Sequence, residues 1–183
     1  MKIGTRSLLF GIHQFLLHPL LLALAWTQVY GLPLDPRLWL AFVVHDLGYW
    51  GKPNMDGPEG EKHVELGARI MRQLFGDQWG DLCLYHSRFY AMRDGHPFSR
   101  LCVADKWLIA IEPWWLYLPR AWASGELAEY MTIGRDKANK YSGIHNETNA
   151  REWYAGVQHY CRGWVLEHKD LKDDSWTRRI INQ

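Results

Sequence analysis

The chain has little cysteine, and its cysteines form no closely spaced pair. Cys83, Cys102 and Cys161 are the three cysteines among 183 residues, and no Cys-x-x-Cys motif is present. An odd number at these spacings argues against a disulfide framework and against a zinc ribbon. Such cysteine usage is typical of proteins from reducing compartments, so we expect a cytoplasmic protein.

The chain also lacks an excess of charge of one sign. It has 21 lysines and arginines against 20 aspartates and glutamates. Proteins that hold duplex nucleic acid do so mainly through a concentrated positive charge, so we expect no duplex nucleic acid partner. Any affinity for phosphate has to come from a few local residues.

No internal repeat, low-complexity tract or convincing series of strands is present in the sequence. At 183 residues, 48% of them hydrophobic, the chain can bury one substantial core and is too short for two ordinary domains. Helical patterns recur instead, and they predict an all-α, single-domain helical bundle over residues 1–183. The predicted helices span about 7–15, 18–30, 36–46, 61–75, 77–92, 99–111, 126–139 and 148–167. The eleven tryptophans are expected to serve mainly in the core and at interfaces.

The N-terminal segment resembles a signal peptide in part. Lys2 and Arg6 precede an apolar run from Leu8 to Trp26, and 23–25 (Ala-Leu-Ala) could serve a signal peptidase. The run nevertheless contains polar or helix-breaking residues, namely His13, Gln14, His18 and Pro19. Such groups are costly at the centre of a bilayer, so we expect a helical segment buried on most sides and no membrane span.

The adjacent residues His45 and Asp46 are the strongest candidates for chemistry. They end the apolar run that begins at Leu38, and Leu47 and Gly48 follow directly. On a regular helix their side chains point about 100° apart, so both can reach one metal ion only near a helix end. The other candidate ligands, in chain order, are His18, His63, His86 and Asp105.

His13 is an alternative to His18 as the first ligand. Pro19 favours a helix start at His18, which in turn favours that residue. Asp105 lies between two apolar segments, where a carboxylate is costly unless it is paired or bound to a metal. We therefore expect Asp105 to be a ligand.

In this order the six residues resemble the HD-domain metal-dependent phosphohydrolases, an all-helical superfamily named after its histidine-aspartate pair. The resemblance covers about residues 16–113. The segments His63–Ala68, Tyr85–Ser87, Ala104–Lys106 and Ile111–Pro113 are similar to the subset with two extra histidines. That subset generally holds two metal ions, and it includes the symmetrical diadenosine tetraphosphate hydrolases.

The resemblance implies an HD-type bundle with the metal site at its centre. After the part that it covers, the helical patterns predict a cover over about 114–168, and the charged residues predict a polar tail at 169–183. It implies a first metal held by His18, His45, Asp46 and Asp105, and a second held by His63 and His86 with Asp46 bridging. Iron, manganese or a similar divalent transition metal suits these ligands, with magnesium, cobalt, nickel and zinc left open. The implied reaction is attack of metal-bound hydroxide on a phosphoester or phosphoanhydride of a nucleotide: a dinucleoside polyphosphate, a nucleoside phosphate or a cyclic nucleotide.

The residues after the pair depart from the family pattern. Many relatives have a lysine two or three residues after the pair, whereas the first lysine here is Lys52, which we expect to act in catalysis or to bind substrate. No Gly-Tyr-Pro motif supports cyclic di-GMP as substrate. Arg88 and Lys106 could bind phosphate or form ordinary salt bridges. Trp50 could stack on a nucleobase or pack against the helix end.

The loop over about 51–61 is rich in glycine and polar residues, and we expect it to be a lid or specificity element. Its Asp56, Glu59 and Glu61 are equal candidates for a general acid or base, or for a partner that orients a ligand histidine.

Two other functions stay open at this point. Some HD-fold proteins with a similar ligand set are mixed-valent di-iron oxygenases, although the close spacing of His86 and Asp105 favours the hydrolases. A regulatory module that binds nucleotide without catalysis is the third reading, and the complete ligand set disfavours it. A homo-oligomer is compatible with the sequence.

Overall fold

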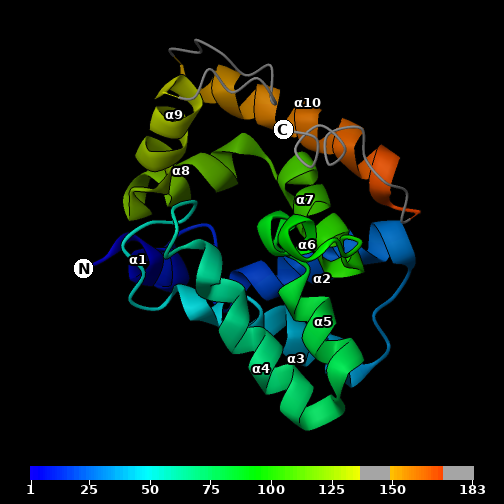
Figure 1. Ribbon diagram of the computed structural model, residues 1–183. Coiled ribbons are helices and arrows are strands. Elements are labelled where there is room, and N and C mark those ends of the chain that lie inside the picture. Colours follow the sequence, from blue (N-terminus) through cyan, green and yellow to red (C-terminus); the bar gives the residue numbers. More distant parts are fainter. Residues whose placement is uncertain (137–148, 171–183) are drawn as a thin grey trace.

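The computed structural model describes residues 1–136 and 149–170, and every regular element in these two ranges is helical (Figure 1). This confirms the predicted all-α class. The α-helices are α1 (Ile3–Phe10), α2 (Leu17–Tyr30), α3 (Pro36–Val44), α4 (Val64–Phe75), α5 (Asp77–Leu84), α6 (Arg88–Asp94), α7 (Arg100–Ile111), α8 (Trp114–Ser124), α9 (Glu126–Asp136) and α10 (Ala150–His168), and two short 3₁₀ helices are η1 (Leu47–Tyr49) and η2 (Glu61–His63). In these ranges no helix combines the length and the hydropathy that a bilayer crossing needs.

Local capping explains where several helices begin. The Asp35 side chain accepts a hydrogen bond from the backbone N–H of Arg37, and Pro36 occupies the first turn of α3, as the sequence predicts. Ser99 caps α7 in the same way by accepting from the N–H of Cys102. The helix α3 directly precedes His45 and Asp46, and α7 contains Asp105.

The predicted helix over 77–92 is wrong in one respect, because the structure divides it into α5 and α6. The backbone of Tyr85 leaves the helical path, and the Ser87 side chain accepts a hydrogen bond from the N–H of Tyr90 to start α6. His86 therefore lies in a break between two helices. The first helix also starts earlier than predicted, at Ile3, and ends at Phe10.

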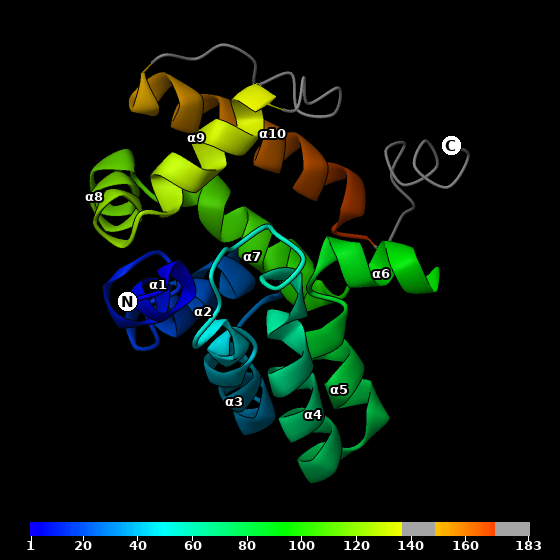
Figure 2. The same cartoon turned by 60° about the vertical axis from the view of Figure 1, so that its left-hand side comes forward.

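The central core lies among α2, α3, α4, α5 and α7. Its buried residues include Leu22, Trp26, Phe42, Met71 and Leu101. The helices α8, α9 and α10 lie at one end of the molecule, and α7 runs between them and the end formed by α3, α4 and α5 (Figures 1 and 2). A second apolar cluster joins α8 to α10 through Tyr117 and Tyr154, whose rings stack at a centroid distance of 4.1 Å. The expected loop at 140–146 and the tail from 171 onward lie outside the described residues.

The N-terminal segment is less buried than predicted. Leu22 and Trp26 of α2 face the core, whereas Leu16, Leu20 and Leu24 are more than half exposed. Six residues of α2 are buried and three are exposed, so the helix is buried on most sides, as expected, except along one exposed stripe that the sequence did not predict. The tryptophans also divide: Trp26, Trp153 and Trp164 are buried, whereas Trp50, Trp115 and Trp122 are among those that face solvent.

Candidate metal centre

At the end of α3 the side chains of the adjacent residues His45 and Asp46 lie close together. The helix stops at Val44, and Leu47–Tyr49 then form a 3₁₀ turn. His45 and Asp46 lie between these elements: His45 keeps helical dihedrals, and Asp46 opens to φ −100° and ψ −4°. Both are buried, and the geometry expected for a shared ion is present.

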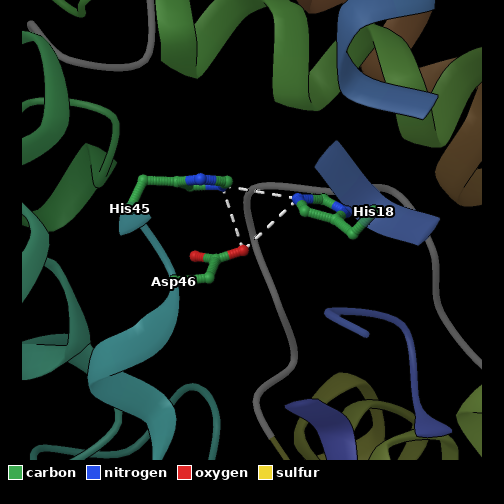
Figure 3. A group of neighbouring side chains, drawn as sticks. All are labelled: His18, His45 and Asp46. Atoms are coloured by element: carbon green, nitrogen blue, oxygen red, sulfur yellow. Dashed lines mark hydrogen bonds and ion pairs between the residues drawn. The ribbon is translucent and has the colours of Figure 1, made fainter. Parts of the chain in front are cut away.

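His18, His45 and Asp46 form a first triad at the centre of the molecule (Figure 3). Asp46 Oδ2 lies 3.0 Å from His45 Nε2 and 3.3 Å from His18 Nε2. The two imidazole Nε2 atoms are 3.4 Å apart. His18 comes from the first turn of α2, so residues 27 positions apart in the chain meet here.

Asp46, His63 and His86 form a second triad around the other carboxylate oxygen. Asp46 Oδ1 lies 3.5 Å from His63 Nε2 and 3.4 Å from His86 Nε2, and the two Nε2 atoms are 3.2 Å apart. His63 ends η2, and His86 lies in the break between α5 and α6. Asp46 thus offers one oxygen to each triad, which is the arrangement of a bridging ligand.

Three of the histidines are held by the same backbone contact. The Nδ1 atoms of His45, His63 and His86 each donate to the carbonyl oxygen three residues earlier, those of Phe42, Gly60 and Cys83. A carbonyl can only accept, so the proton of each neutral ring is on Nδ1 and its Nε2 carries a lone pair. The lone pairs of His63 and His86 therefore face each other, as in metal sites whose ligand histidines are oriented by a backbone carbonyl.

The distances fit shared cations. Ligand atoms that each lie roughly 2.1 Å from one transition-metal ion are about 3.0–3.4 Å apart in octahedral or tetrahedral geometry. The first triad has separations of 3.0, 3.3 and 3.4 Å, and the second has 3.2, 3.4 and 3.5 Å. Asp46 Oδ2 is also buried without a hydrogen bond of acceptable geometry in the described part of the chain. Both triads can hold a metal ion.

Burial and the central carboxylate set the charges of the site. Burial lowers the pKa of His18 to about 4 and, together with His86, holds that of His63 well below its usual range. Burial acts in the same direction on His45, but the Asp46 carboxylate outweighs it and raises the His45 pKa. Burial would raise the pKa of Asp46, and the neighbouring His45 and His13 instead hold it well below normal. Asp46 is therefore ionised at neutral pH.

Asp105 lies at the edge of the first triad. Its Oδ1 is 3.5 Å from His18 Nε2, and its Oδ2 is 3.6 Å from Lys106 Nζ. Burial opposes ionisation of Asp105, whereas Lys106 and His18 favour it and lower the pKa of the carboxyl. The structure thus brings Asp105 beside the site, in contact with one ligand and one cation.

His13 belongs to a different network. Its Nδ1 lies 2.9 Å from Oε1 of the fully buried Glu126, which also accepts from Ser7 Oγ and from the N–H of Ile12. Burial disfavours protonation of His13, but the Asp46 and Glu126 carboxylates raise its pKa to about 9. Of the two alternatives left by the sequence, His18 rather than His13 joins the triad.

Two glycines allow the elements of the site to approach. A Cβ on Gly48 would overlap the carbonyl oxygen of His63, and a Cβ on Gly67 would lie 2.6 Å from the carbonyl oxygen of Val44. The turn after Asp46 can therefore lie directly against η2, and α4 against the end of α3. These contacts explain the glycines that follow both histidine motifs.

The loop after the pair is held to α9. Oε1 of Glu129 accepts from the backbone N–H groups of Met55 and Asp56, at 2.7 and 3.1 Å. The Met55 side chain is 1% exposed and packs with Leu8 and Tyr49. Sequence reasoning missed Glu129, because its partner loop lies more than seventy positions earlier.

Of the three open carboxylates in this loop, Glu61 is hydrogen-bonded to Ser87, the residue that follows His86. Its Oε2 accepts from the Ser87 hydroxyl at 3.1 Å, which links the residues beside His63 and His86. Burial and Asp56 raise its pKa. Asp56 and Glu59 are exposed.

The candidate substrate residues have different surroundings. Arg88 Nη1 donates to the Tyr160 hydroxyl of α10 at 2.8 Å, and Lys106 contacts Asp105. Trp50 is 65% exposed, so it does not pack the helix end. Within the described residues the Lys52 side chain has no ion pair or hydrogen bond to a candidate ligand, and its role stays a prediction.

Comparison with known proteins adds no relative. No protein-family model, no curated protein and no solved structure matches this chain. The resemblance to HD-domain phosphohydrolases rests on the residues between Leu16 and Pro113 and on the two triads that they form.

Proposed function

We propose that this protein is a metal-dependent phosphohydrolase that cleaves a phosphoester or phosphoanhydride bond of a nucleotide. One observation carries the proposal: the two oxygens of the buried Asp46 each face two histidine Nε2 atoms, at 3.0–3.5 Å. A carboxylate shared by two nitrogen-rich triads is the donor set of a binuclear centre for hydrolysis.

The residues that would hold the ions are His18, His45 and Asp46 for one, with Asp105 beside them, and Asp46, His63 and His86 for the other. Two divalent cations supply Lewis acidity: they lower the pKa of a bound water and neutralise the negative charge that develops on a phosphoryl group. Iron or manganese suits the mixed imidazole and carboxylate donors.

The chain's own residues contribute charge and orientation around this centre. Lys106 contacts Asp105, and Arg88 donates to the Tyr160 hydroxyl; in this proposal these two side chains would attract the phosphate oxygens of a substrate. The exposed Trp50 offers a ring on which a nucleobase can stack. Glu61, which accepts a hydrogen bond from Ser87 and whose pKa is raised by burial, is the carboxyl group that we propose as the proton donor to the leaving group.

The test is a hydrolysis screen of the protein loaded with Mn²⁺ or Fe²⁺. Substrates are nucleoside triphosphates, dinucleoside polyphosphates, cyclic dinucleotides and a generic phosphodiester, and the readouts are phosphate or nucleotide release and oxygen consumption. We expect hydrolysis that Asp46→Asn abolishes and that His159→Ala, a change at an exposed histidine outside the site, leaves unchanged.

Two results would overturn the proposal. Oxygen uptake without phosphate release would assign the centre to a di-iron oxygenase instead. Nucleotide binding that persists in Asp46→Asn, without turnover in the wild type, would indicate a regulatory module.

A further inference from the structure

A long uncharged surface lies at the N-terminal side of the molecule. From Ser7 to Leu34 the chain contains no aspartate, glutamate, lysine or arginine, although charged residues are 22% of the whole. A folded helix with one face in water normally carries charged side chains on that face. In α2 two of the three exposed positions are leucine, and the third is the uncharged Gln28.

The outward leucines form one stripe. Leu16, Leu20 and Leu24 are 64%, 59% and 52% exposed and are spaced four residues apart, so they lie in a row along α2 and the residue before it. Phe15 adds an exposed ring beside the first of them. Two more exposed apolar side chains, Trp39 and Val43, lie on α3, which packs against α2.

We propose that this stripe is the contact surface between two copies of the chain. A row of side chains four residues apart is the ridge by which helices most often interlock, and a two-fold axis through its middle sets the row against itself. The absence of charge fits the centre of a protein interface, where charged residues are depleted.

The size of the surface agrees with a homodimer. At their exposed fractions, Phe15, Leu16, Leu20 and Leu24 present roughly 400 Å² per copy, and Trp39 and Val43 on the neighbouring α3 expose roughly 160 Å² more. A stable interface buries about 800 Å² per partner, part of it from a polar rim. A lipid surface is the poorer partner, because helices that lie on membranes carry lysine or arginine along their length and α2 has neither.

Sedimentation and crosslinking test the proposal. We expect a wild-type dimer that Leu20→Asp converts to a monomer with an unchanged circular dichroism spectrum; its melting temperature should no longer depend on protein concentration, as that of the wild type does. Leu166→Asp, at a leucine of α10 that is also 64% exposed, should leave the dimer intact. Cys83, Cys102 and Cys161 are buried and should not react. In the Leu20→Cys variant, mild oxidation should therefore link the introduced cysteines of the two chains by a disulfide, whereas Leu166→Cys should give no such link.

Three outcomes would overturn it. They are a wild-type protein that remains monomeric at concentrations of about 100 µM, a dimer that survives Leu20→Asp, and a monomer that floats with vesicles of phosphatidylcholine and phosphatidylglycerol.

Discussion

The ring of Tyr49 stacks on the ring of His63, with 3.9 Å between the centroids and 8° between the planes. Tyr49 is buried, and it comes from the 3₁₀ turn that directly follows the histidine-aspartate pair. The same short segment therefore supplies one triad with two ligands and fixes the ring plane of a ligand in the other.

Replacing Tyr49 by leucine is expected to loosen His63 without removing any ligand. Contacts that orient a metal-bound histidine typically contribute about 10–100-fold in metal affinity. We expect a loss of this size for one of two Mn²⁺ equivalents in a calorimetric titration, with the other unchanged. The control variant Tyr49→Phe keeps the stacked ring and should bind both ions with unchanged affinity. If Tyr49→Leu weakened the affinity of both triads equally, the stacking on His63 would have no specific effect on the second triad.

Single ligand changes should separate the two triads. We expect His45→Ala to lose the ion of the first triad and His86→Ala that of the second, because these rings contact different oxygens of Asp46. Asp46→Asn should lose both. Metal content after desalting, measured by plasma mass spectrometry, should be near one, one and zero ions per chain; a full complement in Asp46→Asn would contradict the bridging assignment.

Gly48→Ala is expected to lower the free energy of unfolding by about 1–3 kcal/mol, because the new methyl group overlaps the His63 carbonyl. Metal binding should fall with it, since the backbone of a ligand has to move. Gly163→Ala is the matched control: a Cβ there meets nothing, and alanine in a helix should add up to about 1 kcal/mol. Urea unfolding of both variants measures the difference, and a neutral Gly48→Ala would show that the turn has room.

Metal affinity should rise with pH because one proton competes with the metal. Burial keeps the pKa of His18 near 4 and that of His63 far below normal, so neither ring is protonated at neutral pH. The pKa of His45 is raised in the folded protein, so protonation of this ring stabilises the metal-free fold. The stabilisation is complete below the ordinary histidine pKa, and it is lost as the pH rises through the raised pKa of His45.

A metal ion bound to the triad of His18, His45 and Asp46 has to displace the proton of His45. At pH values below the His45 pKa, the affinity of this triad for the metal should therefore increase by up to about tenfold for each unit that the pH rises. Thermal unfolding with and without Mn²⁺ at about pH 6 and pH 8 provides the measurement. A larger stabilisation by metal at the lower pH would contradict the assignment.

The sequence predicted which polar side chains come together better than it predicted the path of the chain. His45 and Asp46 were recognisable because their motif is local, and their turn follows from the helix end at Val44. The break at His86 was missed because residues 84–87 contain no glycine or proline, although Ser87 has the side chain of a helix cap. The exposure of Leu20 and Leu24 was missed because an uncharged run gives no sign of which face meets solvent.

The hydrogen bonds from Met55 and Asp56 to Glu129 bear on how this protein could acquire new specificity. The loop that borders the metal centre takes its shape from α9, a helix outside the segment that carries the ligands. Substitutions in α9 can therefore change the path of this loop while the five residues of the two triads, His18, His45, Asp46, His63 and His86, stay as they are. If the proposed function is correct, the residues that shape the surroundings of the centre and those that would hold its ions lie in separate parts of the chain.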